Sequence, residues 1–246
     1  MSIWHEILFR PLFNGLIFIY NLIPGQDMGI AIIILTIIIR LALYPSQSKA
    51  LIAQKKMRDL QPKLKKIQEK YKNDRQKLAK AQLELYQQEK VSPLSGCLPT
   101  LIQFPIIIAL YQVFRVGLDT SKLTELYSFI PHPETIDPFF LGYFNLSQPD
   151  KFILPIIAGI AQFFQTRMLM PKTKPLKKGK PGFQDILTQQ MVYIMPVMIV
   201  IFAMSLPAAL PLYWIITALF GILQQYLINK GKIGFIKKVK LSVRKK

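Results

Sequence analysis

Long apolar runs alternate with short loops and basic segments along the chain. The runs occupy about residues 28–45, 98–115, 152–170, 191–206 and 211–229. A hydrocarbon core of about 30 Å is crossed by roughly 20 residues in a helix, which satisfies its own backbone hydrogen bonds where no water is available. The pattern therefore predicts an all-α, polytopic membrane protein with five transmembrane helices.

Residues 1–26 hold a shorter apolar run, Leu12–Ile23, which polar and small residues interrupt and which Pro24 and Gly25 end. Because this run is short for a span, we expect an N-terminal amphipathic helix that lies in the membrane interface. Trp4 and Arg10 would then lie near the headgroups. A sixth membrane span is the alternative.

Residues 46–92 carry a different pattern, with apolar side chains at steps of three and four on both sides of Asn73-Asp74. The apolar positions are Met57, Leu60, Leu64, Ile67 and Tyr71 before the break, and Leu78, Ala81 and Leu85 after it. Such spacing is typical of a coiled-coil seam, so we expect a helical hairpin. Pro62 should kink its first arm or begin a new helix after Gln61.

The formal net charge of +19 is unevenly distributed between the apolar runs. Residues 46–92 contain thirteen Lys/Arg, residues 171–190 five, and the tail 230–246 eight, whereas residues 116–150 contain five acids and only Lys122 as a basic residue. Basic loops stay on the cytoplasmic side. The hairpin, the second basic loop and the C-terminus are therefore predicted in the cytoplasm, with the N-terminus outside.

Residues that carry catalysis or bind metals are sparse. Cys97 is the single cysteine, and the two histidines, His5 and His132, lie far apart in sequence. We find no phosphate-binding loop, dinucleotide fingerprint, nucleophile elbow or zinc-protease helix. We therefore expect no metal, no cofactor and no enzymatic activity. The basic charge is explained by membrane topology, so no specific DNA binding is expected.

Arg40 stands out because it lies inside the first apolar run. An arginine at the centre of a spanning helix costs from roughly 2.5 to about 17 kcal/mol, depending on the scale. At helical spacing Thr36, Arg40, Tyr44 and Gln47 form one polar stripe, which favours a functional polar face. The alternative is that Arg40 extends along its helix to the nearby cytoplasmic surface.

Other polar residues in the apolar runs are candidates for the same site. They are Gln103, Gln162, Gln165, Thr217, Gln224 and Gln225, with Trp214 beside them. Gln103 is the best placed, since it lies one turn into its helix from the cytoplasmic side. A single glutamine in a span also commonly makes an interhelical hydrogen bond. Tyr213 and Trp214 are equally explained by an aromatic belt at the membrane surface.

Methionines gather in the fourth apolar run, where Met191, Met195 and Met198 share one helix face. Methionine adapts its shape to varied partners, so this face is a candidate contact surface for client segments. Ordinary core or lipid-facing packing explains it equally well.

Several stretches resemble the YidC-type membrane protein insertases of the Oxa superfamily, and the resemblance extends over nearly the whole chain. They are ILTIIIRL at 34–41 with Pro45, MRDLQPKL at 57–64, PLSGCLP at 93–99 with QFP at 103–105, FLGYFNLSQPD at 140–150, and PLYW at 211–214 followed by Gln224-Gln225. Gly142 stands where this family leads us to expect a tryptophan. The chain resembles the compact five-span form, without the extra first span and large periplasmic domain of Gram-negative members.

The resemblance implies a five-helix insertase core over residues 27–229, with a hydrophilic groove open to cytoplasm and lipid and Arg40 inside it. Nascent membrane proteins would be the clients, and their hydrophobic segments would enter the bilayer without nucleotide hydrolysis. The ribosome and the Sec translocon are expected partners, and a monomer is sufficient. The localisation implied is the bacterial plasma membrane.

Two other functions are open at this point. A small transporter or channel for an anionic solute could use Arg40 as its binding charge, although transporters usually show duplicated halves and this chain has no internal repeat. A scaffold that only docks ribosomes on the membrane would leave Arg40 dispensable.

Overall fold

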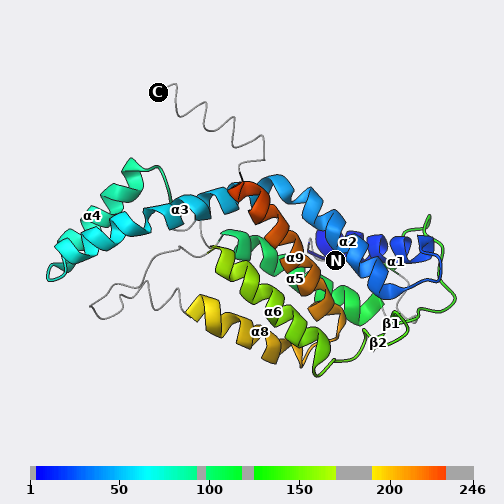
Figure 1. The fold of residues 1–246 in the computed structure, drawn as a ribbon. Coiled ribbons are helices and arrows are strands. Elements are labelled where there is room, and N and C mark those ends of the chain that lie inside the picture. The colour runs from blue at the N-terminus through cyan, green and yellow to red at the C-terminus, as the bar shows by residue number, and fades with distance from the viewer. Residues whose placement is uncertain (1–3, 93–97, 118–124, 170–189, 231–246) are drawn as a thin grey trace.

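The computed structural model describes residues 4–92, 98–117, 125–169 and 190–230. This part of the chain is mostly helical, which confirms the all-α prediction, and its elements are shown in Figure 1. The helices are α1 (Arg10–Leu22), α2 (Met28–Ala42), α3 (Tyr44–Lys70), α4 (Arg75–Gln88), α5 (Leu98–Gly117), α6 (Ile153–Leu169), α8 (Met195–Ala203) and α9 (Ala209–Asn229). Short π-helical segments, His5–Phe9 and Gln190–Ile194, precede α1 and α8, and two strands, β1 (Phe139–Phe140) and β2 (Phe144–Asn145), form a small antiparallel hairpin.

Helix α9 is the central helix of the bundle. It packs against α6 and α2 and also contacts α5 and α3. Leu210, Leu212 and Tyr213 are buried in a core shared with α1, α2, α5 and α6. Gly221 leaves room for the Gln165 side chain of α6, because a Cβ there would lie 2.1 Å from Nε2 of Gln165. Helices α2, α3, α5 and α6 are therefore positioned by their contacts with α9.

The first apolar run does not form one straight helix. Helix α2 ends at Ala42, and α3 follows at an angle of 67°. Pro45 in the first turn of α3 has no N–H to donate to the Leu41 carbonyl, so α2 cannot continue through this position. The predicted helix over 28–45 is therefore wrong at its C-terminal end.

Helices α3 and α4 extend from one end of the bundle, whereas β1 and β2 lie at the opposite end (Figure 1). Leu60, Leu64 and Leu85 form a small core between α3 and α4. Asp74 caps α4 by accepting a hydrogen bond from the Lys77 backbone at 3.0 Å. The pKa of the Asp74 carboxyl is held below its ordinary value, mainly by the hydrogen bond from the Lys77 backbone and secondly by that from the Lys77 side chain.

The structure excludes one of the two outcomes expected at Pro62, the start of a new helix. Helix α3 continues through Pro62, so the new helix expected after Gln61 does not form. A proline inside a helix loses one backbone hydrogen bond. Leu60 and Leu64 flank it and are both buried against α4, and this packing compensates for the lost bond.

Helix α1 is tied to the segment that contains β1 and β2. Asn14 is buried and donates hydrogen bonds to the carbonyls of Arg10 and Glu125, at 2.8 and 3.0 Å. The backbone N–H of Asp137 donates to the Tyr20 hydroxyl at 2.9 Å. Gly142, in the turn between the strands, has a φ of 68°, which explains a glycine where the family resemblance suggests tryptophan.

The length and composition of the helices indicate which of them could cross a membrane. Among the described residues, α9 alone is long and apolar enough to span a membrane by itself, and the bent pair α2–α3 passes the same criterion together. Helix α6 and the segment Gln190–Ala203 are apolar but shorter.

We predict that Gly29→Ala destabilises the protein. A Cβ at Gly29 would lie 2.1 Å from Cδ2 of Phe140 and 2.6 Å from its Cβ, so the whole β1 residue must move. Overpacking of this kind costs about 1–3 kcal/mol, and each kcal/mol lowers the Tm of a chain of this size by about 2–4 °C. The measurement is thermal unfolding of the purified protein in detergent.

Gly15→Ala is the matched control. A Cβ at Gly15 meets only Leu35 at 3.4 Å, an ordinary contact, and alanine favours a helix over glycine by about 1 kcal/mol. We expect an unchanged or higher Tm for Gly15→Ala, and equal effects of both substitutions would contradict the close contact of α2 with β1.

Candidate functional site

Arg40 lies in the last turn of α2 and is only 7% exposed. Its Nη1 donates to Oε1 of Gln47 in α3 at 2.9 Å, and its Nη2 donates to Oε1 of Gln103 in α5 at 2.7 Å. Nε2 of Gln103 in turn donates to the hydroxyl of Tyr213 in α9. These four residues form the Arg40 network, which joins four helices.

The partners of Arg40 are neutral amides. Within the described residues no carboxylate lies in ion-pair distance of its guanidinium, and its Nε is buried without a hydrogen-bond partner. A buried cation without a counter-ion is costly, because desolvation is not offset by Coulombic attraction. The positive charge is therefore available to an anionic or strongly polar group.

The burial of Arg40 argues against the surface-extended alternative. Its side chain turns into the bundle towards Gln103 and Tyr213. Tyr213 is 1% exposed, so an aromatic belt does not describe it. Sequence reasoning missed Tyr213 as a network member, since nothing local to α9 indicates which of its two adjacent aromatic residues faces α5.

The predicted polar stripe is broken by the bend after α2. Thr36 is buried one turn before Arg40, and its hydroxyl donates to the Ile32 carbonyl of its own helix at 2.6 Å. The Tyr44 ring packs edge-on against Phe220 of α9, with centroids 6.5 Å apart. Of the two predicted stripe residues that follow the bend, Gln47 is the one that hydrogen-bonds Arg40. A single stripe over one straight helix was therefore the wrong geometry.

A second polar cluster lies where α3 meets α9. Gln224 is 1% exposed, and its Nε2 donates to the Ser48 hydroxyl at 2.9 Å and to the Tyr44 carbonyl at 3.3 Å. Nε2 of Gln225 and Nη1 of Arg58 both donate to the Met168 carbonyl at 3.4 Å. These glutamines make the interhelical hydrogen bonds that were the alternative to groove lining.

The other predicted site residues lie apart from the Arg40 network. Gln162 donates to Thr166 within α6 at 3.2 Å. Trp214 packs partly buried against the main core, and the Thr217 hydroxyl is buried without a partner among the described residues. Gln162, Trp214 and Thr217 therefore stay predictions as groove residues.

The three methionines are on the surface. Met191, Met195 and Met198 are 51%, 49% and 40% exposed, which suits either a client contact surface or lipid-facing packing. The motif at 93–97, residues 171–189 of the second basic loop, and the tail from 231 onward lie outside the described residues.

Comparison with known proteins gives a consistent set of relatives. The family described as 60Kd inner membrane protein matches residues 18–235. The chain is 37% identical over 237 residues to membrane protein insertase YidC 2 of Bacillus anthracis, covering 94% of this chain and 83% of that one. It is 38% identical over 247 residues to membrane protein insertase YidC 1 of Halalkalibacterium halodurans, covering 99% and 85%. For membrane protein insertase YidC of Histophilus somni, 37% identical over 229 residues, the match covers 93% of this chain but 38% of the relative.

We predict that Gln103→Leu destabilises the bundle more than Tyr213→Phe does. The leucine leaves both Arg40 and Tyr213 without their partner, and each unsatisfied buried group costs about 1–3 kcal/mol. Tyr213→Phe leaves only Nε2 of Gln103 without its partner, one group instead of two, so the expected loss is about half as large. Thermal unfolding of both single variants and the double variant in detergent provides the measurement.

Gln112→Leu is the control, because Gln112 lies on the same helix, is exposed, and accepts only a long, exposed hydrogen bond of 3.4 Å from Nε1 of Trp4 among the described residues. We expect little change in its Tm. Strictly additive effects of Gln103→Leu and Tyr213→Phe would contradict a connected network, since contacting residues in one network are coupled.

Proposed function

The chain belongs to the family of 60Kd inner membrane proteins, the YidC-type membrane protein insertases, and we propose on this premise that it inserts nascent membrane proteins into the bilayer. The observation that carries the proposal is Arg40, a buried cation held by neutral side chains at the junction of four helices.

The polar residues around Arg40 extend over a considerable depth of the bundle. Tyr213 and Gln224 are both buried on α9 and both hydrogen-bonded to other helices. Eleven residues separate them, or roughly 16 Å at 1.5 Å per residue, which is about half of a 30 Å hydrocarbon core. A polar region of this depth would shorten the apolar path that a client's polar tail must cross.

In this mechanism Arg40 holds the polar, often acidic, tail of a client while its hydrophobic segment moves into lipid. Arg40 would lower the barrier for the tail, because an opposite charge offsets part of the desolvation cost. The driving force is transfer of the apolar segment, about 25 cal/mol per Å² of buried surface, so no nucleotide is consumed. Thr36, Tyr44, Gln47 and Gln103 would line the groove near Arg40. A transporter of anionic solutes is less consistent with the relatives, which are named insertases.

The proposed topology uses α2, α5, α6, the segment Gln190–Ala203, and α9 as five spans. Helices α3 and α4 would form a cytoplasmic hairpin, which is supported by their separate small core and by the thirteen Lys/Arg of residues 46–92. Residues 1–26 would lie in the outer interface and the tail 230–246 in the cytoplasm. The basic hairpin and tail suit a ribosome or Sec translocon partner, and one copy suffices.

We predict that Arg40→Ala reduces insertion and that Arg40→Lys retains much of it. Attraction to an acidic tail requires a cation more than a guanidinium fork. A loss of about tenfold is expected for the alanine variant, the equivalent of about 1.4 kcal/mol in the barrier. The measurement is protease protection of a client with an acidic tail in proteoliposomes. Arg115→Ala is the control, because Arg115 lies in the last turn of α5, at the opposite end of that helix from Gln103. Normal insertion by the Arg40→Ala variant would refute the proposed role of Arg40.

We also expect photo-crosslinkers at Thr36, Arg40 and Gln103 to capture ribosome-bound nascent membrane segments. A crosslinker at Leu83, exposed on α4 and far from the network along the chain, is the control for non-specific capture. Equal labelling at Leu83 and at Thr36, Arg40 and Gln103 would indicate docking near the membrane without a groove.

A further inference from the structure

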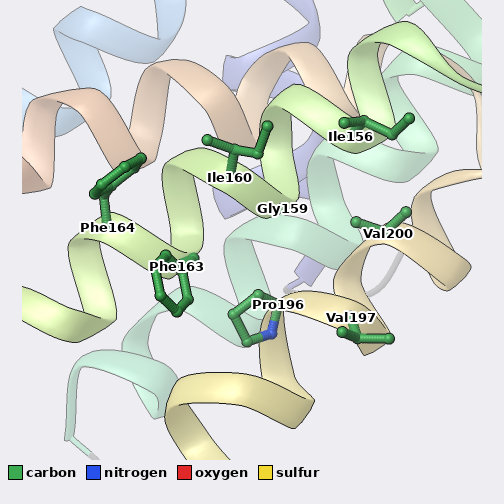
Figure 2. A pocket seen from close by; sticks show the side chains of 8 residues that line it. All are labelled: Ile156, Gly159, Ile160, Phe163, Phe164, Pro196, Val197 and Val200. Carbon is green, nitrogen blue, oxygen red and sulfur yellow. The ribbon is translucent and has the colours of Figure 1, made fainter.

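A groove runs between α6 and α8, away from the Arg40 network. It has a volume of about 420 Å³ and is lined by hydrocarbon side chains, among them Ile156, Ile160 and Phe163 of α6 and Val197 and Val200 of α8. Figure 2 shows Phe163 and Pro196 facing each other across this space. The groove presents no polar group to an occupant.

The shape of the groove follows from close packing at its base. A Cβ at Gly159 would lie 2.3 Å from Cγ2 of Val200, so this glycine lets α6 and α8 touch. Ile160 and Val197 are 52% and 57% exposed at the rim. The groove is therefore closed towards the bundle interior. It is open on the side of α6 and α8 that faces away from the bundle, where a membrane protein meets lipid.

One end of the groove carries a positive charge. The Arg167 guanidinium lies 5.8 Å from the centre of the Phe163 ring, and the Tyr193 ring lies 6.1 Å from the same ring. In the described part of the chain no carboxylate lies within ion-pair distance of Arg167, which is exposed in the last turn of α6. Among the described residues, the Arg167 cation therefore has no anionic partner at the groove's end.

We infer that this groove binds one acyl chain of an anionic phospholipid, with Arg167 contacting its phosphate. The distance from Ile156 to Arg167 is eleven residues, roughly 16 Å along the helix, or about the depth of one leaflet of a 30 Å core. An apolar groove one leaflet deep, with a cation at the headgroup end, matches the chemistry of a phospholipid.

A client helix does not match this groove. A helix with its side chains is about 10–12 Å across and needs about 30 Å of length to span the membrane, a cylinder of roughly 2,400–3,400 Å³, so a groove of about 420 Å³ could receive only a small part of it. The site itself requires only that the protein is in a membrane. The proposed topology places Arg167 at the cytoplasmic end of α6, so we assign the lipid to the inner leaflet. This assignment rests on the proposed function.

The test is native mass spectrometry of the full-length protein released from micelles with added phosphatidylglycerol or with phosphatidylcholine of identical chains. We expect one phosphatidylglycerol to be retained preferentially. Arg167→Gln should lower this retention about fivefold, the equivalent of about 1 kcal/mol for one basic residue at a charged surface. Val197→Trp, which fills the groove from its exposed rim, should abolish retention of both lipids at this site.

Arg115→Gln is the matched control, because its guanidinium also lies 5.8 Å from an aromatic ring, that of Tyr111, at the end of α5. It should retain phosphatidylglycerol like the unsubstituted protein, and circular dichroism should show that all variants are folded. Equal retention by the unsubstituted protein, Arg167→Gln and Val197→Trp would overturn the proposal, as would crosslinking of a client segment or a second copy at Val197 that displaces the lipid. Arg40→Ala should leave lipid retention unchanged, so failure of the insertase mechanism is measured separately.

Discussion

A guanidinium cation buried in a helical bundle must find hydrogen-bond acceptors, and this requirement organises the structure around Arg40. The acceptors are amide oxygens from α3 and α5, and Tyr213 of α9 extends the network. Neutral partners reduce the cost of burial but leave the charge uncompensated. The side chain that links α2, α3 and α5 by hydrogen bonds therefore also carries an uncompensated positive charge.

The bend after Ala42 gives this network its geometry. Pro45 ends α2 and starts α3, and the 67° turn brings Gln47 back onto the guanidinium. The same turn places Ser48 against Gln224 of α9. Because α3 continues into the contact with α4, one proline-directed bend connects the buried charge with the basic helices outside the bundle.

The two sides of the bundle differ in the interactions that they offer. Around Arg40 polar groups from four helices meet in the interior, whereas between α6 and α8 the surface is hydrocarbon until Arg167 at its end. Electrostatic attraction is stronger at the buried Arg40 than at the protein surface, because the effective dielectric constant is lower there. In the second region the binding energy of the proposed lipid comes from apolar contact with α6 and α8, and Arg167 only selects an anionic headgroup. Each region therefore suits a different kind of ligand.

The sequence by itself determined the helical character, the positions of α5, α6 and α9, the seam of α3 and α4, and the unusual placement of Arg40, because hydropathy and periodicity are local properties. It also identified Gln47 and Gln103 as candidates. Pro45 is a local signal that α2 must end, but only the tertiary structure decided the direction of the 67° bend, that Tyr213 completes the network, and that Gly159 packs against Val200 at the base of the groove between α6 and α8. Those features depend on which faces of distant helices meet, and no local pattern specifies that choice.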